Sequence, residues 1–129
     1  KRGESTAYDG KCKNLSEDQK QKLVDQGREP AMRFLAGSET VQFDDLVKGK
    51  IEIQGENIVD FILVRPDGMP MYNFACAVDD YHMAITHVIR GDDHVSNTPR
   101  QILLYWAMQW TQPQFAHIPM ILGKDRNRP

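Results

Sequence analysis

The chain has 129 residues and a formal net charge of −2, with 40% hydrophobic and 26% charged residues. This composition is typical of one folded domain, or of two small ones sharing a core, and any contact with nucleic acid has to be local. No apolar run approaches the ~20 residues that span a membrane, and the charged start Lys1–Glu4 predicts no signal peptide. Two cysteines are too few for a disulfide framework, so we expect a reducing, cytoplasmic setting.

Residues 1–64 begin with a polar segment, which is followed by one in which apolar and polar residues alternate. Ser16 and Gln19 have the spacing of a capping box, which predicts a short exposed helix over about residues 17–26, ended by Gly27. From Pro30 onwards apolar residues alternate with polar ones or form short β-branched runs. This pattern predicts a small mixed or antiparallel sheet.

The remainder alternates between helical and strand patterns. We expect a helix over residues 72–84, a buried strand over 85–89, a second helix opened by Thr98 and Pro99, and a strand over 115–122. The second helix has an apolar stripe made of Ile102, Leu103, Tyr105, Trp106 and Trp110. Helix–strand–helix–strand is typical of an open parallel sheet. Two such strands cannot close a core, so we expect further strands before Lys1 or after Pro129.

Polar side chains gather where the first of these strands ends, and they are Arg90, Asp92, Asp93 and His94. Open parallel sheets bind ligands beyond the carboxyl ends of their strands. An arginine there can hold a carboxylate or phosphate, and an aspartate can accept hydrogen bonds from ribose hydroxyls. The sequence therefore predicts a site for a small zwitterion and a nucleotide.

Simpler interpretations stay open for several of these residues. Arg90 can be paired with Asp92 or Asp79 and bind nothing. The aspartates and histidines of residues 79–94 have metal-binding chemistry, but their spacing matches no strong metal signature. We expect His117 to be a structural histidine. The aromatic residues expected in the core rather than at a stacking platform are Tyr72, Trp106 and Trp110.

Six segments carry a resemblance to a known family, and they are Tyr8–Cys12, Met71–Ala75, Val78–Asp80, Ile85–His94, Ser96–Gln101 and Phe115–Gly123. Together they resemble the glutamyl-tRNA synthetase family, and the resemblance covers essentially the whole chain. A run of matches this long is far more specific than any one short motif.

The resemblance implies an α/β fold in which a class I catalytic domain is split by an insertion. Residues 1–71 resemble most of that small α+β insertion, which binds the tRNA acceptor stem, and residues 72–129 resemble the second half of the Rossmann-like parallel sheet. The family's His-Ile-Gly-His motif would precede Lys1, and its Lys-Met-Ser-Lys-Ser loop would follow Pro129. We therefore expect an internal fragment without catalytic residues, inactive alone, from an enzyme that is a monomer when intact.

The resemblance also implies roles for individual residues. Those expected to bind glutamate are Tyr72, Cys76 and Arg90, and those expected to bind ATP are Asp92, Asp93, His94, Met120 and Ile121. Related glutaminyl enzymes lack the arginine, and a neutral amide would leave a buried guanidinium unpaired, so Arg90 favours glutamate. ATP is expected as a substrate, with Mg²⁺ in the intact enzyme. Cys12 matches one zinc ligand of some relatives, but Asn14 replaces the expected histidine, so no zinc is predicted.

The implied reaction begins with attack of glutamate on the α-phosphate of ATP, which gives glutamyl-adenylate. The glutamyl group then passes to the 3′ end of tRNA. Three other interpretations stay open: a shortened paralogue that glutamylates a modified tRNA base, a non-catalytic RNA-binding module built on residues 1–71, and a metal-dependent hydrolase built on the Asp/His cluster.

Overall fold

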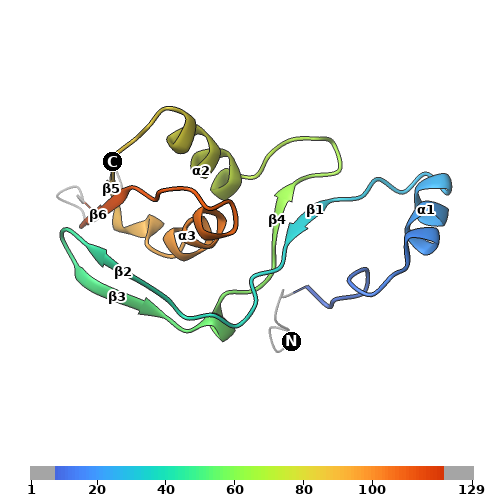
Figure 1. Cartoon of the computed structure of the whole chain (residues 1–129), viewed down its shortest axis with the longest axis horizontal. Coiled ribbons are helices and arrows are strands. Elements are labelled where there is room, and N and C mark those ends of the chain that lie inside the picture. Colours follow the sequence, from blue (N-terminus) through green and yellow to red (C-terminus); the bar gives the residue numbers. More distant parts are fainter. Residues whose placement is uncertain (1–7, 121–129) are drawn as a thin grey trace, which may run out of the picture.

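The structure is a computed structural model that describes residues 8–120, and Figure 1 shows its elements. Three α-helices, six strands and two short 3-10 helices occur in this part of the chain. In chain order they are α1 (Glu17–Asp25), β1 (Met32–Phe34), β2 (Val41–Asp45), β3 (Gly49–Ile53), η1 (Gly55–Asn57), β4 (Phe61–Val64), α2 (Tyr72–His82), β5 (His87–Gly91), η2 (Asp92–His94), α3 (Thr98–Ala107) and β6 (Gln114–Ile118).

The main sheet is mixed and has the strand order β3-β2-β6-β5. Strands β5 and β6 run parallel, as helix–strand–helix–strand predicts, and β6 also pairs in parallel with β2 at Asp45 and Phe115. Strand β3 returns antiparallel to β2. Strands from either side of residue 71 therefore lie in one sheet.

The expected sheet of residues 30–64 is divided into two pairs. Strands β1 and β4 pair antiparallel and form a separate two-stranded sheet. Strands β2 and β3 form a hairpin whose alternating buried side chains, Val41 and Phe43, face the core. The pairing is antiparallel as predicted, but the hairpin belongs to the larger sheet because its apolar face is covered there.

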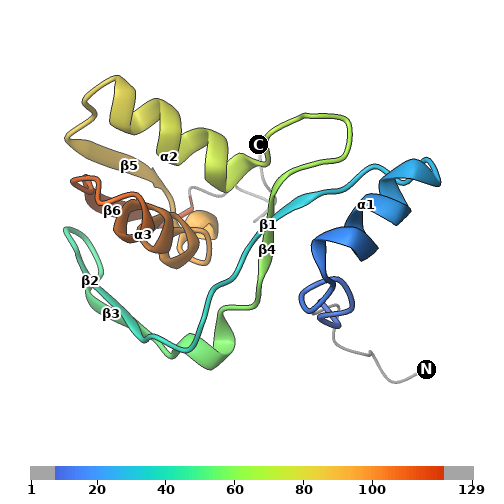
Figure 2. The ribbon, with the colours of Figure 1, turned by 45° about the vertical axis from the view of Figure 1, so that its right-hand side comes forward.

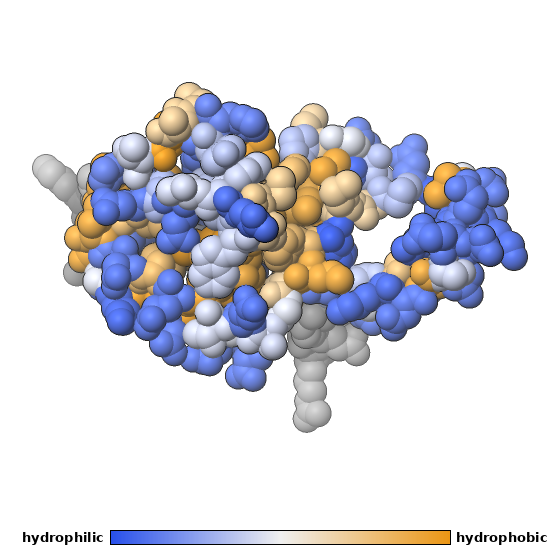
Figure 3. Space-filling model, in the orientation of Figure 1, coloured by the Kyte–Doolittle hydropathy of each residue, from blue (hydrophilic) through white to orange (hydrophobic). Residues whose placement is uncertain are grey.

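Helix α1 forms as the capping box predicts. The Ser16 hydroxyl accepts a hydrogen bond from the Gln19 N–H at 3.3 Å, and the Gln19 side chain accepts one from the Ser16 N–H at 2.9 Å. The chain leaves the helix through Gly27, whose φ of +79° favours glycine. No residue of α1 is buried, and Figure 3 shows hydrophilic side chains over this end of the molecule.

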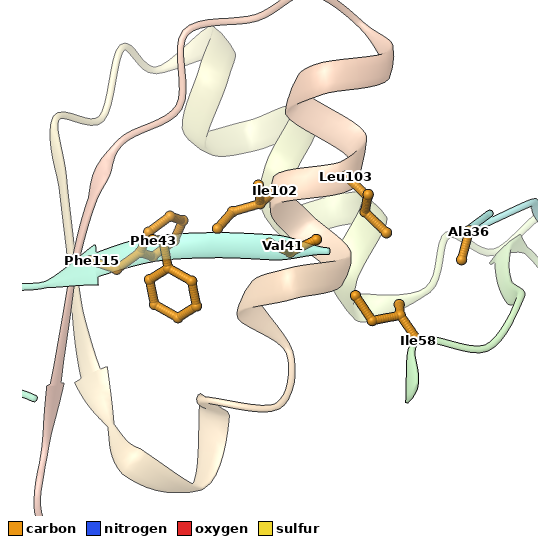
Figure 4. Close-up of a cluster of buried hydrophobic side chains, with 7 residues drawn as sticks. All are labelled: Ala36, Val41, Phe43, Ile58, Ile102, Leu103 and Phe115. Carbon is orange, nitrogen blue, oxygen red and sulfur yellow. The ribbon is translucent and has the colours of Figure 1, made fainter. Parts of the chain in front are cut away.

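The core has two clusters, and α3 contributes to both. Figure 4 shows the first, which lies between α3 and the β2 and β6 strands and comprises Ala36, Val41, Phe43, Ile58, Ile102, Leu103 and Phe115. The second joins α3 to α2 through Ala77, Leu104 and Tyr105. In Figure 2, α3 lies between α2 and the β2–β3 hairpin. Helix α3 is thus the central packing element of the described residues.

Strand β5 is less buried than its sequence predicts. Its residues His87 and Ile89 are exposed, with Ile89 at 63%. The prediction that the strand over 85–89 is buried was therefore wrong. Within residues 8–120, β5 is the edge strand of the sheet, and no described element covers the face on which Ile89 lies. The strand also starts later, since Ala84 has a φ of +52° after the end of α2.

Two of the three aromatic residues expected in the core lie elsewhere. Trp106 is 42% exposed, because it lies on the outer side of α3 while its neighbour Tyr105 is buried. Tyr72 begins α2 and is 46% exposed. Trp110 does pack on the second cluster, where its ring stacks on Tyr81 at 4.2 Å. Strand β6 ends at Ile118, and the rest of the strand predicted to residue 122 lies partly outside the described residues.

Candidate functional site

The polar residues of interest lie at the carboxyl ends of three neighbouring strands. Arg90 is near the end of β5, directly opposite His117 of β6, and Asp45 ends β2. Because these strands are parallel, their ends meet at one edge of the sheet. The first turns of α2 and α3 reach the same edge and supply further polar groups, which are described below.

Arg90 is held by three side chains. Its Nε donates a hydrogen bond to His117 Nε2 at 3.1 Å. Its Nη2 donates to Thr98 Oγ1 at 2.8 Å and to Gln101 Oε1 at 2.9 Å. These partners are all buried, so the guanidinium is anchored in the protein along one edge. The simple pairing of Arg90 with Asp92 does not occur, because Asp92 pairs with Lys48 at 3.2 Å.

His117 connects this arginine to a buried carboxylate. Its Nδ1 lies 2.5 Å from Asp45 Oδ2, and both side chains are inaccessible to solvent. Asp45 Oδ1 also accepts hydrogen bonds from the backbone N–H groups of His117, Val47 and Lys48. Burial alone would raise the pKa of Asp45, but these hydrogen bonds outweigh it and lower the pKa to about 2. Asp45 is therefore ionised at neutral pH.

The sequence reasoning missed Asp45, although a signal was present. Val41, Phe43 and Asp45 share one phase of an alternating strand, so a carboxylate stands where an apolar residue is expected. A buried carboxylate needs partners. The expectation that His117 is a structural histidine agrees with its burial, but its contact with Arg90 also makes it part of this site.

Tyr72 and Cys76, both expected to bind glutamate, lie on the first turns of α2 within interaction range of Arg90. Burial raises the pKa of the Tyr72 hydroxyl, the Cys76 thiol adds to the increase, and Arg90 opposes it. Burial also raises the pKa of the Cys76 thiol, and a hydrogen bond with Tyr72 opposes it. Both groups are thus neutral at pH 7. The structure brings all three proposed glutamate residues together.

The residues expected to bind ATP are brought together only in part. Asp92, Asp93 and His94 form η2 immediately after β5, and the His94 ring lies 5.5 Å from the Tyr72 ring. A Cβ added at Gly91 would lie 2.6 Å from Asp93 Oδ1, so this carboxylate folds back over the glycine. Met120 follows the end of β6 and is 36% exposed. Ile121 lies outside the described residues.

Among residues 8–120, no three histidine, cysteine or acidic side chains converge in a way that would hold a metal ion. A shallow hollow lies at the opposite, amino ends of β5 and β6, where Asp80, Tyr105 and Gln114 line it. Its lining does not include the side chains that hold Arg90. In the described part of the chain, every helix is too short to cross a membrane.

The chain matches the family of class I tRNA synthetases (E and Q), catalytic domain, over residues 1–128. It belongs to this family. Its polar residues lie at the carboxyl ends of parallel strands, where open α/β sheets bind their ligands.

Individual relatives are glutamate–tRNA ligases. The chain is 48% identical over 128 residues to the one from Bacillus licheniformis and 50% identical over 128 residues to the one from Carboxydothermus hydrogenoformans. Each match covers 98% of this chain but 26% and 27% of the relative, so the chain spans about a quarter of their length. A crystal structure of a glutamate tRNA ligase from Elizabethkingia meningosepticum in complex with its amino acid matches with a TM-score of 0.84 and 36% identity, over 94% of this chain and 26% of that one.

Proposed function

We propose that the protein containing this chain activates L-glutamate with ATP and transfers it to the 3′ end of a tRNA. The observation that carries the proposal is the Arg90 guanidinium, which is anchored at the carboxyl end of β5 beside Tyr72 and Cys76. Its Nε and Nη2 donate to His117, Thr98 and Gln101, and the Tyr72 hydroxyl is a further hydrogen-bonding neighbour of the guanidinium. A side-chain carboxylate of the substrate has the charge that complements this guanidinium.

Arg90 selects glutamate over glutamine because an amide offers it no opposite charge. With glutamine the guanidinium would face a neutral amide instead of a carboxylate in a partly buried site, and loss of such a charged hydrogen-bond partner costs about 1–3 kcal/mol. A site built to bind one polar group therefore rejects the analogue that lacks it. Tyr72 and Cys76 line the same site.

ATP would bind at the neighbouring strand ends. In this proposal Asp93 accepts hydrogen bonds from the ribose, Asp92 and His94 line the same rim, and the backbone of Met120 and Ile121 meets the adenine. Glutamate then attacks the α-phosphate, and the glutamyl group is transferred to the tRNA in a second step. Mg²⁺ would accompany ATP in the intact enzyme. The residues of this chain bind and orient, because such chemistry depends on positioning and charge stabilisation.

The proposed division of the chain places the acceptor-stem-binding insertion in residues 1–71 and the second half of the Rossmann-like sheet in residues 72–129. Helix α1 and the β1–β4 pair, which lie apart from the main sheet, support an insertion. The β2–β3 hairpin joins the main sheet, so the two parts share a core. We further propose a monomeric, cytoplasmic enzyme without zinc, and no activity from residues 1–129 alone.

The test is glutamate-dependent exchange of pyrophosphate into ATP by the full-length protein that carries this chain. Arg90→Gln removes the charge at similar length and should lower kcat/KM for glutamate by about 30- to 150-fold, as loss of 2–3 kcal/mol predicts. Arg100→Gln is the matched control, because Arg100 donates to the backbone oxygen of Ser96 outside the cluster. Equal use of glutamate and glutamine by the unaltered protein would refute the assignment.

The tRNA step has its own test. A tRNA without its terminal adenosine should accept no glutamate if the 3′ end is the acceptor. Glutamylation of a base, as in the shortened paralogue, would continue on that tRNA. Binding of tRNA with no glutamate-dependent exchange would instead indicate the RNA-binding module.

A further inference from the structure

The contacts around His117 constrain where its protons lie. The Asp45 carboxylate is ionised and can only accept hydrogen bonds, so the His117 Nδ1 that faces it must donate. The Arg90 Nε can only donate, so the His117 Nε2 that faces it must accept. One state of the imidazole satisfies both contacts, and it is the neutral tautomer with the proton on Nδ1.

This arrangement balances charge in a buried place. The positive charge of Arg90 and the negative charge of Asp45 lie on either side of a neutral ring, and the partners on α3, Thr98 and Gln101, are neutral. On α2, the Asp80 carboxyl also interacts with the charge of the arginine. The other neutral tautomer of His117, with the proton on Nε2, would place that N–H against the N–H of the Arg90 Nε. Two donors cannot bond to each other, so the guanidinium would turn out of its position.

We propose that Asp45 and His117 are positioning residues for Arg90. The Asp45 carboxylate fixes the tautomer of His117, and His117 in turn fixes the orientation of the guanidinium. The inference rests on the proposed function, because the arginine so held is the one that meets the substrate's side-chain carboxylate. It assigns to the β2–β3 hairpin, whose Asp45 is 45 residues before Arg90 in the chain, a part in selecting glutamate.

Two substitutions of His117 separate positioning from packing. Both remove the same buried ring. The amide of Gln reaches about as far as Nε2 and can still accept from Arg90, whereas the shorter amide of Asn reaches Asp45 and loses Arg90. In the full-length protein, His117→Asn should raise the KM for glutamate roughly tenfold or more with little change in kcat or in the KM for ATP. His117→Gln should restore most of the affinity. Equal effects of both substitutions would contradict the proposal.

A second pair changes the carboxylate. Asp45→Asn is isosteric, and its NH₂ group can face Nδ1, which would move the ring proton to Nε2 and oppose Arg90. We expect the KM for glutamate to rise roughly tenfold. Asp44→Asn is the matched control, because Asp44 is the exposed neighbour on the other face of β2. A parallel rise in the KM for ATP, or an unchanged KM for glutamate, would overturn the positioning role.

The unaltered full-length protein offers a test without any variant. Its histidine ring ¹⁵N shifts at neutral pH should show that His117 has a protonated Nδ1 and an unprotonated Nε2, and a protonated Nε2 would overturn the inference. Failure of the proposed function looks different, since the unaltered protein would then show no glutamate-dependent exchange. An active protein with unaffected variants refutes the positioning alone.

Discussion

Acid should weaken the fold through Asp45, and the structure gives the size of the effect. The pKa of this carboxyl is lowered from 3.8 to about 2 in the folded chain. Because the folded-state pKa is the lower one, the stabilisation is present above pH 3.8 and is lost as the pH falls towards 2. At 1.36 kcal/mol per pKa unit, ionised Asp45 contributes about 2 kcal/mol near pH 6, and about half of that should be gone at pH 3.

The assay is urea unfolding of the 129-residue chain at several pH values between 6 and 3, followed by the fluorescence of Trp106 and Trp110. Asp45→Asn carries no titrating group, so its free energy of unfolding should fall less steeply with acid than that of the unaltered chain, by about 1 kcal/mol over this range. Asp44→Asn should keep the original slope, since Asp44 is exposed. Parallel pH profiles for the unaltered chain and Asp45→Asn would refute the reasoning.

Three further outcomes follow from local geometry. Gly55→Ala should destabilise the chain by more than about 2 kcal/mol in urea unfolding. The new Cβ would lie 2.2 Å from the Ser38 backbone carbon, so the backbone must move. A destabilisation below about 0.5 kcal/mol would contradict this. Tyr105→Phe should lower the free energy of unfolding by less than about 1 kcal/mol in the same assay, since the buried Tyr105 hydroxyl has no hydrogen-bond partner among the described residues. A larger decrease would show that the hydroxyl has a hydrogen-bond partner. Ser16→Ala should weaken α1 by about 1 kcal/mol, seen as faster amide exchange in Glu17–Asp25, and unchanged exchange there would refute the capping role.

Local signals predicted the elements well. The capping box sets the start of α1, and the proline at Pro99 marks the first turn of α3, because such signals involve only a few neighbouring residues. The expected cap at Thr98 was wrong: the cap position is Asn97, which makes no side-chain capping hydrogen bond, and the Thr98 hydroxyl contacts Arg90 instead. The alternation of Val41 and Phe43 likewise marks β2. What these patterns could not give is the partner of each strand, which is why one expected sheet became two.

The site depends on contacts between distant residues, and these escaped prediction. Asp45 and His117 are 72 positions apart, and no local pattern pairs them. The exposure of Ile89 depends on which elements cover the sheet, not on its apolar neighbours. By contrast, the position of Arg90 at the carboxyl end of β5, with Asp92 and Asp93 directly after it, could be predicted from the local strand pattern.

The hairpin formed by β2 and β3 limits how this polypeptide can be divided. Val41 and Phe43 complete the apolar layer against Ile102, and Lys48 at the hairpin turn pairs with Asp92 on the far side of residue 71. A chimera joined at residue 71 would take the β2–β3 hairpin, which covers one side of the core, away from residues 72–129. Any exchange of segments between relatives therefore has to carry the hairpin along with the sheet in which it lies.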